Sequence, residues 1–287
     1  MKTTFITLFF VILSGLSIAQ YAPPAGQVGT TAIHKDSSTI VGWATGVEVV
    51  RELIDISNPS AEHEGSNYAS FGTPEEALGE AEGNSMNIVS LGDGGMATLT
   101  FAKPIRNGEG HDFCVFENGF SDTYLELAFV EVSSDGSRFV RFPAISLTQT
   151  DTQIDGFGSL DATKIHNLAG KYRQGYGTPF DLEDLIDSAD IDLNNITHVR
   201  IIDVVGSINP LYTRYDSQGN TINDLFNTPF SSGGFDLDAI GVIHESDEVS
   251  LDELSTIHFL AYPNPFSDII HVKWNSDLPV EQILCII

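Results

Sequence analysis

Acidic side chains are the groups in this chain whose type and spacing suggest chemistry, since Asp and Glu number 40 against 13 Lys and Arg. Asp236 and Asp238 stand two residues apart in an alternating run. In a β-strand both point to one face, about 6.6 Å apart, while Phe235, Leu237 and Ala239 face the core. Two carboxylates on one face repel each other unless a cation or a basic side chain lies between them. Calcium, which takes about six to eight oxygen ligands, suits such a pair.

Four further residues carry oxygen atoms that suit the same ion. Glu117 and Asn118 end an apolar run, Asp112 precedes that run, and Asp93 stands between glycines. The predicted metal ligands are therefore Asp93, Asp112, Glu117, Asn118, Asp236 and Asp238, with calcium as the cofactor. No continuous loop matches an EF-hand, so an alternative stays open. These acids would then only solvate strand ends and turns, where Asp-Gly and Asn-Gly are common for backbone reasons.

Aromatic residues in two long connections, 164–182 and 208–234, are the candidates for contact with a ligand. Loop aromatics beside Asn and Asp suit stacking on sugar rings, although they can equally pack the loops onto the sheet. Asp203 interrupts an apolar run, where it would contact a ligand or accept hydrogen bonds from loop N–H groups, and the second interpretation is favoured. The predicted ligand-binding residues are Tyr172, Tyr176, Asp203, Tyr212, Arg214 and Tyr215.

Motifs for catalysis are missing from the sequence. It contains no G-x-S-x-G nucleophile elbow and no HExxH or His-x-His pair, so neither a serine hydrolase nor a zinc site is predicted. The segment 92–95 lacks the Lys and Ser or Thr of a phosphate-binding loop. Among 40 acids some pair will meet the carboxylate spacing of a glycosidase by chance. We therefore predict a protein that is not an enzyme and has no catalytic residues.

Short strands separated by turns must position these groups, because 26 Gly and 12 Pro interrupt the chain repeatedly. An Asp-Gly turn at 135–136 joins two of them as a hairpin. The predicted strands are Asn87–Leu91, Ala97–Ala102, Phe113–Glu117, Glu126–Ser133, Arg138–Phe142, His198–Val205 and Phe235–Ile243. Capping patterns predict short helices at 74–81 and 179–186, with another at 165–172. The fold class is all-β: a two-sheet, jelly-roll-like sandwich with a few short helices in long loops.

The ends of the chain and its charge indicate an exported protein. Residues 1–19 have the basic start, short apolar run and small residues of a signal peptide, with cleavage before Gln20. No other stretch is long and apolar enough for a transmembrane helix. The net charge of −27 excludes general nucleic-acid binding. We divide the mature chain into a β-sandwich domain at 20–245, an acidic linker at 246–260 and a terminal domain at 261–287.

Two resemblances extend this interpretation. The stretch that begins YPNPFSDII, from Tyr262, resembles the opening of the C-terminal sorting domain of type IX secretion cargo in Gram-negative bacteria. It covers residues 261–287 and implies a truncated sorting domain, with the type IX machinery as partner. An ordinary terminal hairpin is the alternative.

The motifs LGDGGMATLTF, DFCVFENGF, AFVEVSSDGSRFVRFPA and SGGFDLDAIGVI, within about residues 40–245, are similar to bacterial secreted "cell surface proteins". The first of them also resembles the entry to galactose-binding-like jelly rolls. These resemblances imply an architecture and a location on the outer face of the outer membrane, or secretion. They imply no catalytic residues.

The expected function is therefore that of an exported, non-catalytic, calcium-stabilised binding module that recognises a glycan or a similar small ligand through end loops. Two alternatives remain. One is an accessory protein that captures a nutrient, such as a corrinoid or an oligosaccharide, for an outer-membrane transporter. The other is a surface hydrolase that uses a pair of carboxylates.

Overall fold

The computed structural model of the chain describes residues 21–246, 258–262 and 271–275. The signal peptide at 1–19, most of the acidic linker and most of the sorting-domain motif lie outside these residues. The strands are β1 (Ile33–His34), β2 (Gly42–Val50), β3 (Val89–Ser90), β4 (Met96–Ile105), β5 (Phe113–Glu117), β6 (Ala128–Ser133), β7 (Val140–Arg141), β8 (Ile145–Ser146), β9 (Ile165–His166), β10 (Tyr176–Phe180), β11 (Ile196–Asp203), β12 (Asp236–Val242), β13 (His258–Tyr262) and β14 (His271–Asn275).

The protein is all-β, and its helical segments are three short 3-10 turns within the described part of the chain. They are η1 (Pro74–Ala77), η2 (Ala162–Lys164) and η3 (Leu182–Leu185). Two of the three expected helices are therefore single turns. The expected helix at 165–172 instead begins with strand β9, and residues 179–180 of the other belong to β10, because Asp181 and not Thr178 caps the turn that follows.

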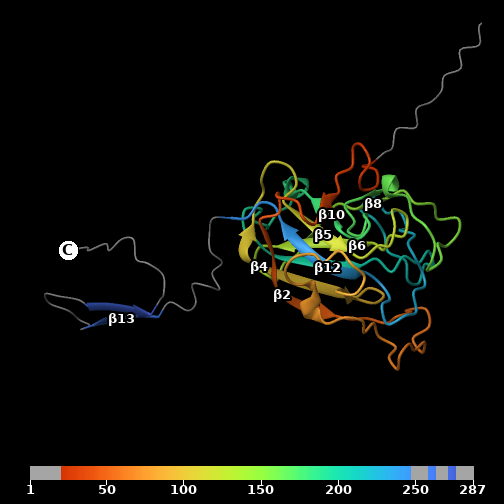
Figure 1. Cartoon of the computed structure of the whole chain (residues 1–287), viewed down its shortest axis with the longest axis horizontal. Helices are drawn as coiled ribbons and strands as arrows, with labels where there is room; N and C mark the ends of the chain where they lie inside the picture. Colours follow the sequence, from red (N-terminus) through yellow and green to blue (C-terminus); the bar gives the residue numbers. More distant parts are fainter. Residues whose placement is uncertain (1–20, 247–257, 263–270, 276–287) are drawn as a thin grey trace, which may run out of the picture.

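Most strands belong to one antiparallel sheet that curls on itself (Figure 1). Its order is β1-β10-β5-β12-β2-β4-β11-β6-β7, with β3 paired to the start of β12. Strand β2 joins two halves: it pairs with β12 at Gly42 and Trp43, and with β4 from Ala44 onward. A register shift at Ala44–Gly46 marks the point where β2 passes from one half to the other. This arrangement fits a sandwich whose two layers share one strand.

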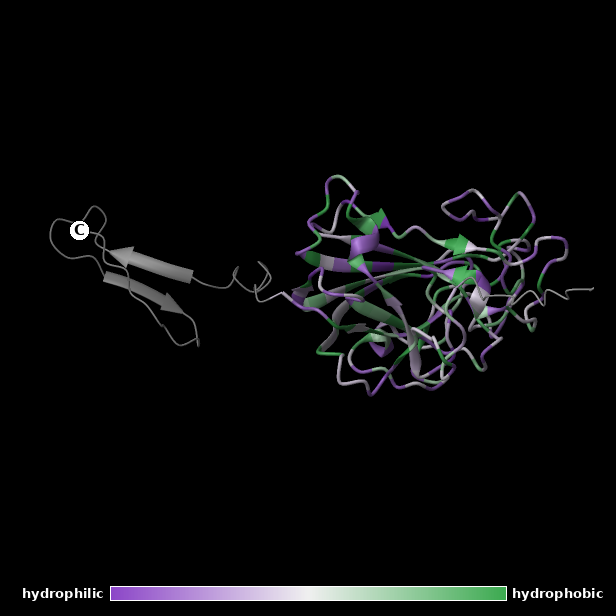
Figure 2. Ribbon diagram, turned by 90° about the horizontal axis from the view of Figure 1, so that it is seen from above, coloured by the Kyte–Doolittle hydropathy of each residue, from purple (hydrophilic) through white to green (hydrophobic). Residues whose placement is uncertain are grey.

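The largest core cluster lies between the two halves. It combines Val115 and Ile240, from β5 and β12, with Leu99 and Val199, from β4 and β11. Strands β5 and β12 are buried along their whole length, because a smaller cluster that includes Trp43 covers their other face. Figure 2 shows hydrophobic segments along the central strands and many hydrophilic ones in the loops around them. The burial thus places the ends of β5 and β12 inside the protein, together with the acids found there.

The hairpin turn between β6 and β7 has the backbone conformation that its Asp-Gly sequence favours. The predicted hairpin turn joins β6 and β7, where Gly136 adopts a φ of 72° and Asp135 Oδ1 accepts hydrogen bonds from the N–H groups of Ser137 and Arg138. Strands β13 and β14 pair with each other from His258 to Tyr262.

No helix among the described residues is long and apolar enough to cross a membrane.

Candidate functional site

Five buried carboxyl groups gather at one end of the curled sheet, and we call them the acidic cluster. Its members are Glu117, Glu126, Asp203, Asp224 and Asp236. Topology brings them together: the end of β5 lies beside the start of β12, because these strands are antiparallel. The end of β11 lies beside the start of β6 for the same reason. A hydrogen bond of 2.8 Å from Phe235 N to Asp203 Oδ1 links the two pairs across the sandwich.

Two of the predicted metal ligands, Glu117 and Asp236, belong to this cluster, and a third, Asn118, contacts it. Asn118 Nδ2 donates a hydrogen bond of 2.9 Å to Asp236 Oδ2, and the hydroxyl of Ser90 donates to the other oxygen of the same carboxyl. Glu117 Oε2 accepts a hydrogen bond of 2.8 Å from Gly119 N. Glu117 Oε1 and Asn118 Oδ1 are fully buried and have no hydrogen-bond partner. Two acceptor atoms thus lie in the protein interior without a donor, which is costly for folding.

Burial dominates the electrostatics of the cluster. It raises the pKa of Glu117 and of Glu126 well above the ordinary range, and the nearby charge of Asp236 raises both further. Burial also raises the pKa of Asp224 to about 8 and that of Asp236 to about 7. Each shift has the sign expected when a carboxylate loses water and faces other carboxylates. Without a cation, the carboxyls of Glu117, Glu126 and Asp224 therefore keep their protons to a higher pH than exposed carboxyls do.

Asp203 itself is held by the backbone of three loops. Its carboxyl accepts hydrogen bonds from Gly94 N, Val205 N and Phe235 N at 2.7 to 2.8 Å. These bonds lower its pKa against the effect of burial, so the pKa reaches only about 6. The structure thus agrees with the favoured interpretation of Asp203, in which N–H groups of the loops donate to its carboxyl. Asp224 is held in the same way, by the backbone N–H groups of Leu127 and Leu225.

The other predicted metal ligands lie elsewhere, so the six do not form one site. Asp93 accepts a hydrogen bond of 2.7 Å from Ile56 N and lies near Asp203, at the margin of the cluster. Asp112 precedes the opposite end of β5, where Gly108 N, Leu182 N and His244 contact its carboxyl.

Asp238 is separated from Asp236 by a register shift in β12, and its carboxyl accepts hydrogen bonds from the backbone N–H groups of Glu82 and Gly83. The expected pair of facing carboxylates is thus divided: each has its own donors.

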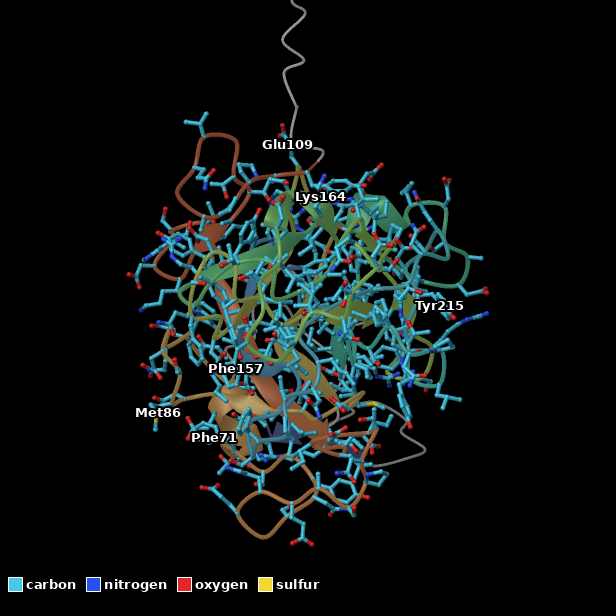
Figure 3. The ribbon with its side chains drawn as sticks, turned by 90° about the vertical axis from the view of Figure 1, so that its right-hand side faces the viewer. Phe71, Met86, Glu109, Phe157, Lys164 and Tyr215 are labelled. Atoms are coloured by element: carbon cyan, nitrogen blue, oxygen red, sulfur yellow. The ribbon has the colours of Figure 1, made fainter. Side chains whose placement is uncertain are left out.

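Aromatic side chains lie beside the acidic cluster. Phe120 and Tyr124 stack with ring centroids 5.2 Å apart. Burial, together with the charges of Glu126 and Glu117, raises the pKa of Tyr124, so its hydroxyl lies close to the carboxyls. That hydroxyl donates a hydrogen bond of 3.3 Å to Gly156 O. The next residue, Phe157, is exposed and visible on the face shown in Figure 3.

The predicted ligand-binding aromatics do not form one surface. Tyr172 is buried, and its hydroxyl shares a hydrogen bond of 2.8 Å with Thr31. The guanidinium of Arg173 lies over the ring of Tyr176, with its Cζ 4.7 Å from the ring centroid.

The second group lies on another loop. Arg214 donates a hydrogen bond of 3.0 Å to Tyr212 O, and its charge acts on Asp93 and Asp203. Tyr215 is 55% exposed and lies at the periphery in Figure 3.

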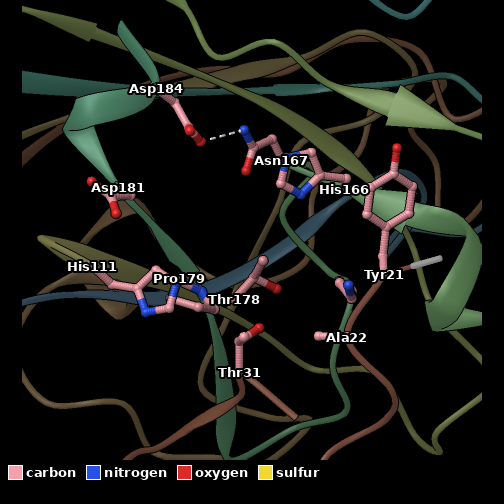
Figure 4. Close-up of a pocket in the computed structure, with 11 residues that line it drawn as sticks. Tyr21, Ala22, Thr31, His111, His166, Asn167, Thr178, Pro179, Asp181 and Asp184 are labelled. Atoms are coloured by element: carbon pink, nitrogen blue, oxygen red, sulfur yellow. Dashed lines mark hydrogen bonds between the residues drawn. The ribbon is translucent and has the colours of Figure 1, made fainter. Parts of the chain in front are cut away.

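A pocket of about 380 Å³ opens at the other end of β10 (Figure 4). It is lined by Tyr21, Ala22, Thr31, His111, His166, Asn167, Lys171, Thr178, Pro179, Asp181 and Asp184. The rings of Tyr21 and His166 stack with centroids 4.9 Å apart and nearly parallel planes. Asn167 Nδ2 donates a hydrogen bond of 2.8 Å to Asp184 Oδ2. One wall is therefore aromatic, and another carries amide and carboxyl groups.

Two polar groups of this pocket stand out. Thr178 is 4% exposed, and its hydroxyl has no hydrogen-bond partner. Lys171 is also buried; its Nζ donates a hydrogen bond of 2.8 Å to Ile165 O, and burial lowers its pKa to about 8. Thr178 thus brings a buried hydroxyl without a partner to the wall of the pocket, while the ammonium group of Lys171 is already engaged.

Sequence reasoning missed this pocket, because its residues come from four separated segments. Of the predicted ligand-binding residues, Tyr172 lies next to the pocket, because its hydroxyl shares a hydrogen bond with Thr31, which lines it. The only local signal was the motif LAGKY, in which Lys171 interrupts an apolar run.

Comparison with known proteins adds no identity to this geometry. No protein-family model, no curated protein and no solved structure matches the chain. Within the part of the chain that the structure describes, no three His, Cys, Asp or Glu side chains are already converged in a metal-binding arrangement.

Proposed function

We propose that the chain is an exported, non-catalytic binding module whose pocket beside β10 takes a glycan or a similar hydroxyl-rich ligand. The observation that carries this proposal is a pocket of about 380 Å³ with one aromatic wall and one wall of amide and carboxyl groups, beside which Thr178 keeps a buried hydroxyl without a partner. A buried hydroxyl without a partner loses free energy unless a ligand completes its hydrogen bonds. A sugar hydroxyl both donates and accepts, so it satisfies Thr178 once that side chain rotates its buried oxygen into the pocket.

The remaining walls suit the same ligand class. The stacked rings of Tyr21 and His166 offer an apolar surface for the C–H face of a sugar ring. The free oxygens of Asp181 and Asp184 can accept hydrogen bonds from ring hydroxyls, since each carboxyl uses one oxygen within the protein. Pockets of this size hold small ligands, so one or two sugar rings fit better than a corrinoid.

Export and surface attachment belong to the same proposal. The signal peptide at 1–19 and the sorting motif from Tyr262 support transport to the outer face of the outer membrane or beyond by the type IX machinery. A pocket with a polar wall and an aromatic wall suits a protein that meets free oligosaccharides there. Capture of an oligosaccharide for a transporter is compatible with this pocket, whereas a hydrolase would have to use the carboxyls of Asp181 and Asp184 for turnover.

The test is a calorimetric titration of the mature protein with a panel of oligosaccharides, followed by chromatography of the sugars after incubation. Thr178→Val keeps the side-chain shape, and we expect it to weaken binding roughly tenfold, which corresponds to the loss of one good hydrogen bond. Tyr21→Ala removes the stacking surface and should weaken it roughly three- to tenfold. The matched control, Tyr215→Ala, removes an exposed tyrosine outside the pocket.

Three outcomes would count against this function. One is a panel without any binder. The second is equal weakening of binding by Tyr215→Ala and Tyr21→Ala. The third is the appearance of cleaved sugar, which would replace the binding module by the hydrolase.

A further inference from the structure

We infer that Glu117, Asn118, Glu126 and Asp236 form a calcium-binding site at the end of β5. The inference does not depend on the pocket beside β10, because the two sites have no residue in common. It begins from the two buried oxygen atoms without a donor, Glu117 Oε1 and Asn118 Oδ1. Both residues are more than nine-tenths buried. A hard cation is the partner that such atoms lack.

The orientation of Asn118 is determined by its neighbour. Its Nδ2 donates to Asp236 Oδ2 at 2.9 Å, and the opposite orientation of the amide would place its oxygen against the carboxylate. The amide oxygen is therefore turned away from Asp236 and toward a place where no described donor reaches it. An Asn in this position presents its oxygen as a metal ligand would.

Glu117 is arranged in a comparable way. Its Oε2 accepts the N–H of Gly119, which leaves Oε1 as the free ligand atom. Gly119 allows this close approach: a Cβ there would lie 3.0 Å from Glu117 Oε2 and 2.9 Å from Tyr124 O. Gly119 thus lies against both the carboxyl of Glu117 and the backbone of Tyr124.

Charge supports a cation at this place. Glu117, Glu126 and Asp236 are close enough to repel one another. No described residue donates a hydrogen bond to the carboxyl of Glu126, which is only 7% exposed. Arg51 attracts Asp236, but its guanidinium donates to Gly72 O at 2.6 Å, so it neutralises at most one of the three. A divalent ion would offset the remaining repulsion.

The donor set selects calcium among the common ions. All candidate ligands are oxygen atoms, from carboxyl and amide groups, and no His or Cys is among them, which disfavours zinc. Magnesium requires an almost ideal octahedron and gives up its waters reluctantly, whereas calcium accepts irregular sets of about six to eight oxygens. No three carboxyl groups among the described residues converge on one point, so calcium binding requires a change in the side-chain conformations of the cluster. The flexible coordination of calcium tolerates such an adjustment better than that of magnesium.

The first experiment measures the melting temperature of the mature protein after dialysis against EDTA, and again with calcium or magnesium chloride. We expect calcium at about 100 times its Kd to raise Tm by roughly 5–10 °C, and magnesium to do less. Glu117→Gln keeps the oxygen that accepts the Gly119 N–H but cannot supply the negative charge that a bound calcium ion needs. We expect it to raise Tm in EDTA and to abolish the calcium response. The control Glu109→Gln makes the same substitution at an exposed position (Figure 3) and should keep the full response.

A second measurement needs no charge variant, in case Glu117→Gln fails to fold. Terbium(III) replaces calcium in oxygen sites and emits when a nearby tyrosine is excited, and Tyr124 lies beside the cluster. We expect Tyr124→Phe to lose most of the sensitised emission while calorimetry shows calcium affinity changed by less than about threefold.

Three results would overturn the inference: no Tm response to calcium, an equal response in Glu117→Gln, or unchanged terbium emission in Tyr124→Phe. The first of these would mean that the cluster holds shared protons in place of a metal ion. None of them bears on glycan binding, which is measured separately at Tyr21 and Thr178.

Discussion

Replacing Asp93 by Asn should make the protein more stable, by an amount that grows with pH. Asp93 is 4% exposed, and burial together with the charge of Asp203 raises its pKa from 3.8 to about 8. The folded chain therefore keeps this proton up to about pH 8, whereas the unfolded chain releases it near pH 4. Between these values the native state binds more protons, so its stability falls as pH rises.

The magnitude follows from the shift. A difference of about 4 pKa units at about 1.36 kcal/mol each corresponds to roughly 6 kcal/mol across the whole window, and to roughly 4 kcal/mol at pH 7. The amide of Asp93→Asn cannot ionise, but its oxygen can still accept the hydrogen bond from Ile56 N. We expect the variant to match the wild type at pH 4 and to exceed its stability increasingly toward pH 8.

Urea unfolding followed by circular dichroism, at intervals from pH 4 to 8.5, measures this difference directly. Asp36→Asn serves as the control, because it removes one negative charge from an exposed side chain beside Lys35. A difference between Asp93→Asn and the wild type that stays constant with pH, within about 1 kcal/mol, would refute the reasoning. A decline in the variant as steep as in the wild type would have the same meaning.

Two further substitutions test other buried charges. Burial lowers the pKa of Lys171 from 10.5 to about 8, so the unfolded chain binds more protons between these values, and wild-type stability should rise by roughly 3 kcal/mol from pH 8 to 10.5. Lys171→Met should abolish that rise in alkaline urea titrations, and a persistent rise would contradict it. Asp203→Asn places an NH2 group against N–H groups that now donate to both carboxyl oxygens, so we expect a loss of roughly 2–4 kcal/mol. Urea unfolding at pH 7 checks this value; a loss under about 1 kcal/mol would show that the loops do not depend on the carboxyl.

Local patterns in the sequence were sufficient for several elements. Strand β5 coincides with the predicted Phe113–Glu117, because a short apolar run rich in aromatic and β-branched residues favours a buried strand and is too short for a typical helix. Strand β2 was missed, since Gly42 and Gly46 interrupt its alternation. Strand β10 was missed because Pro179 beside an acidic cap resembles the start of a helix.

For the candidate metal ligands, too, the sequence indicates the chemistry of the side chains, and tertiary contacts decide their environment. The sequence by itself indicates that Glu117, Asn118 and Asp236 carry oxygen atoms that can coordinate a metal ion near strand ends. It also shows the excess of acids that makes calcium a reasonable ion. Whether a carboxyl is free or satisfied depends on which backbone N–H groups approach it. Asp238 meets Glu82 and Gly83, which lie more than 150 residues away along the chain.

The pocket shows what only tertiary structure decides. Tyr21, His166 and Thr178 belong to segments whose local patterns predict nothing about one another. They meet because β10 pairs with β5 and because Tyr21 N donates a hydrogen bond to Thr163 O, which holds the segment at Tyr21 beside residues 163–166. Sequence thus determined residue chemistry and local conformation, which depend on near neighbours. Burial and convergence arise from long-range pairing, so the empty hydrogen-bonding positions of Thr178, Glu117 and Asn118 become visible only in the folded chain.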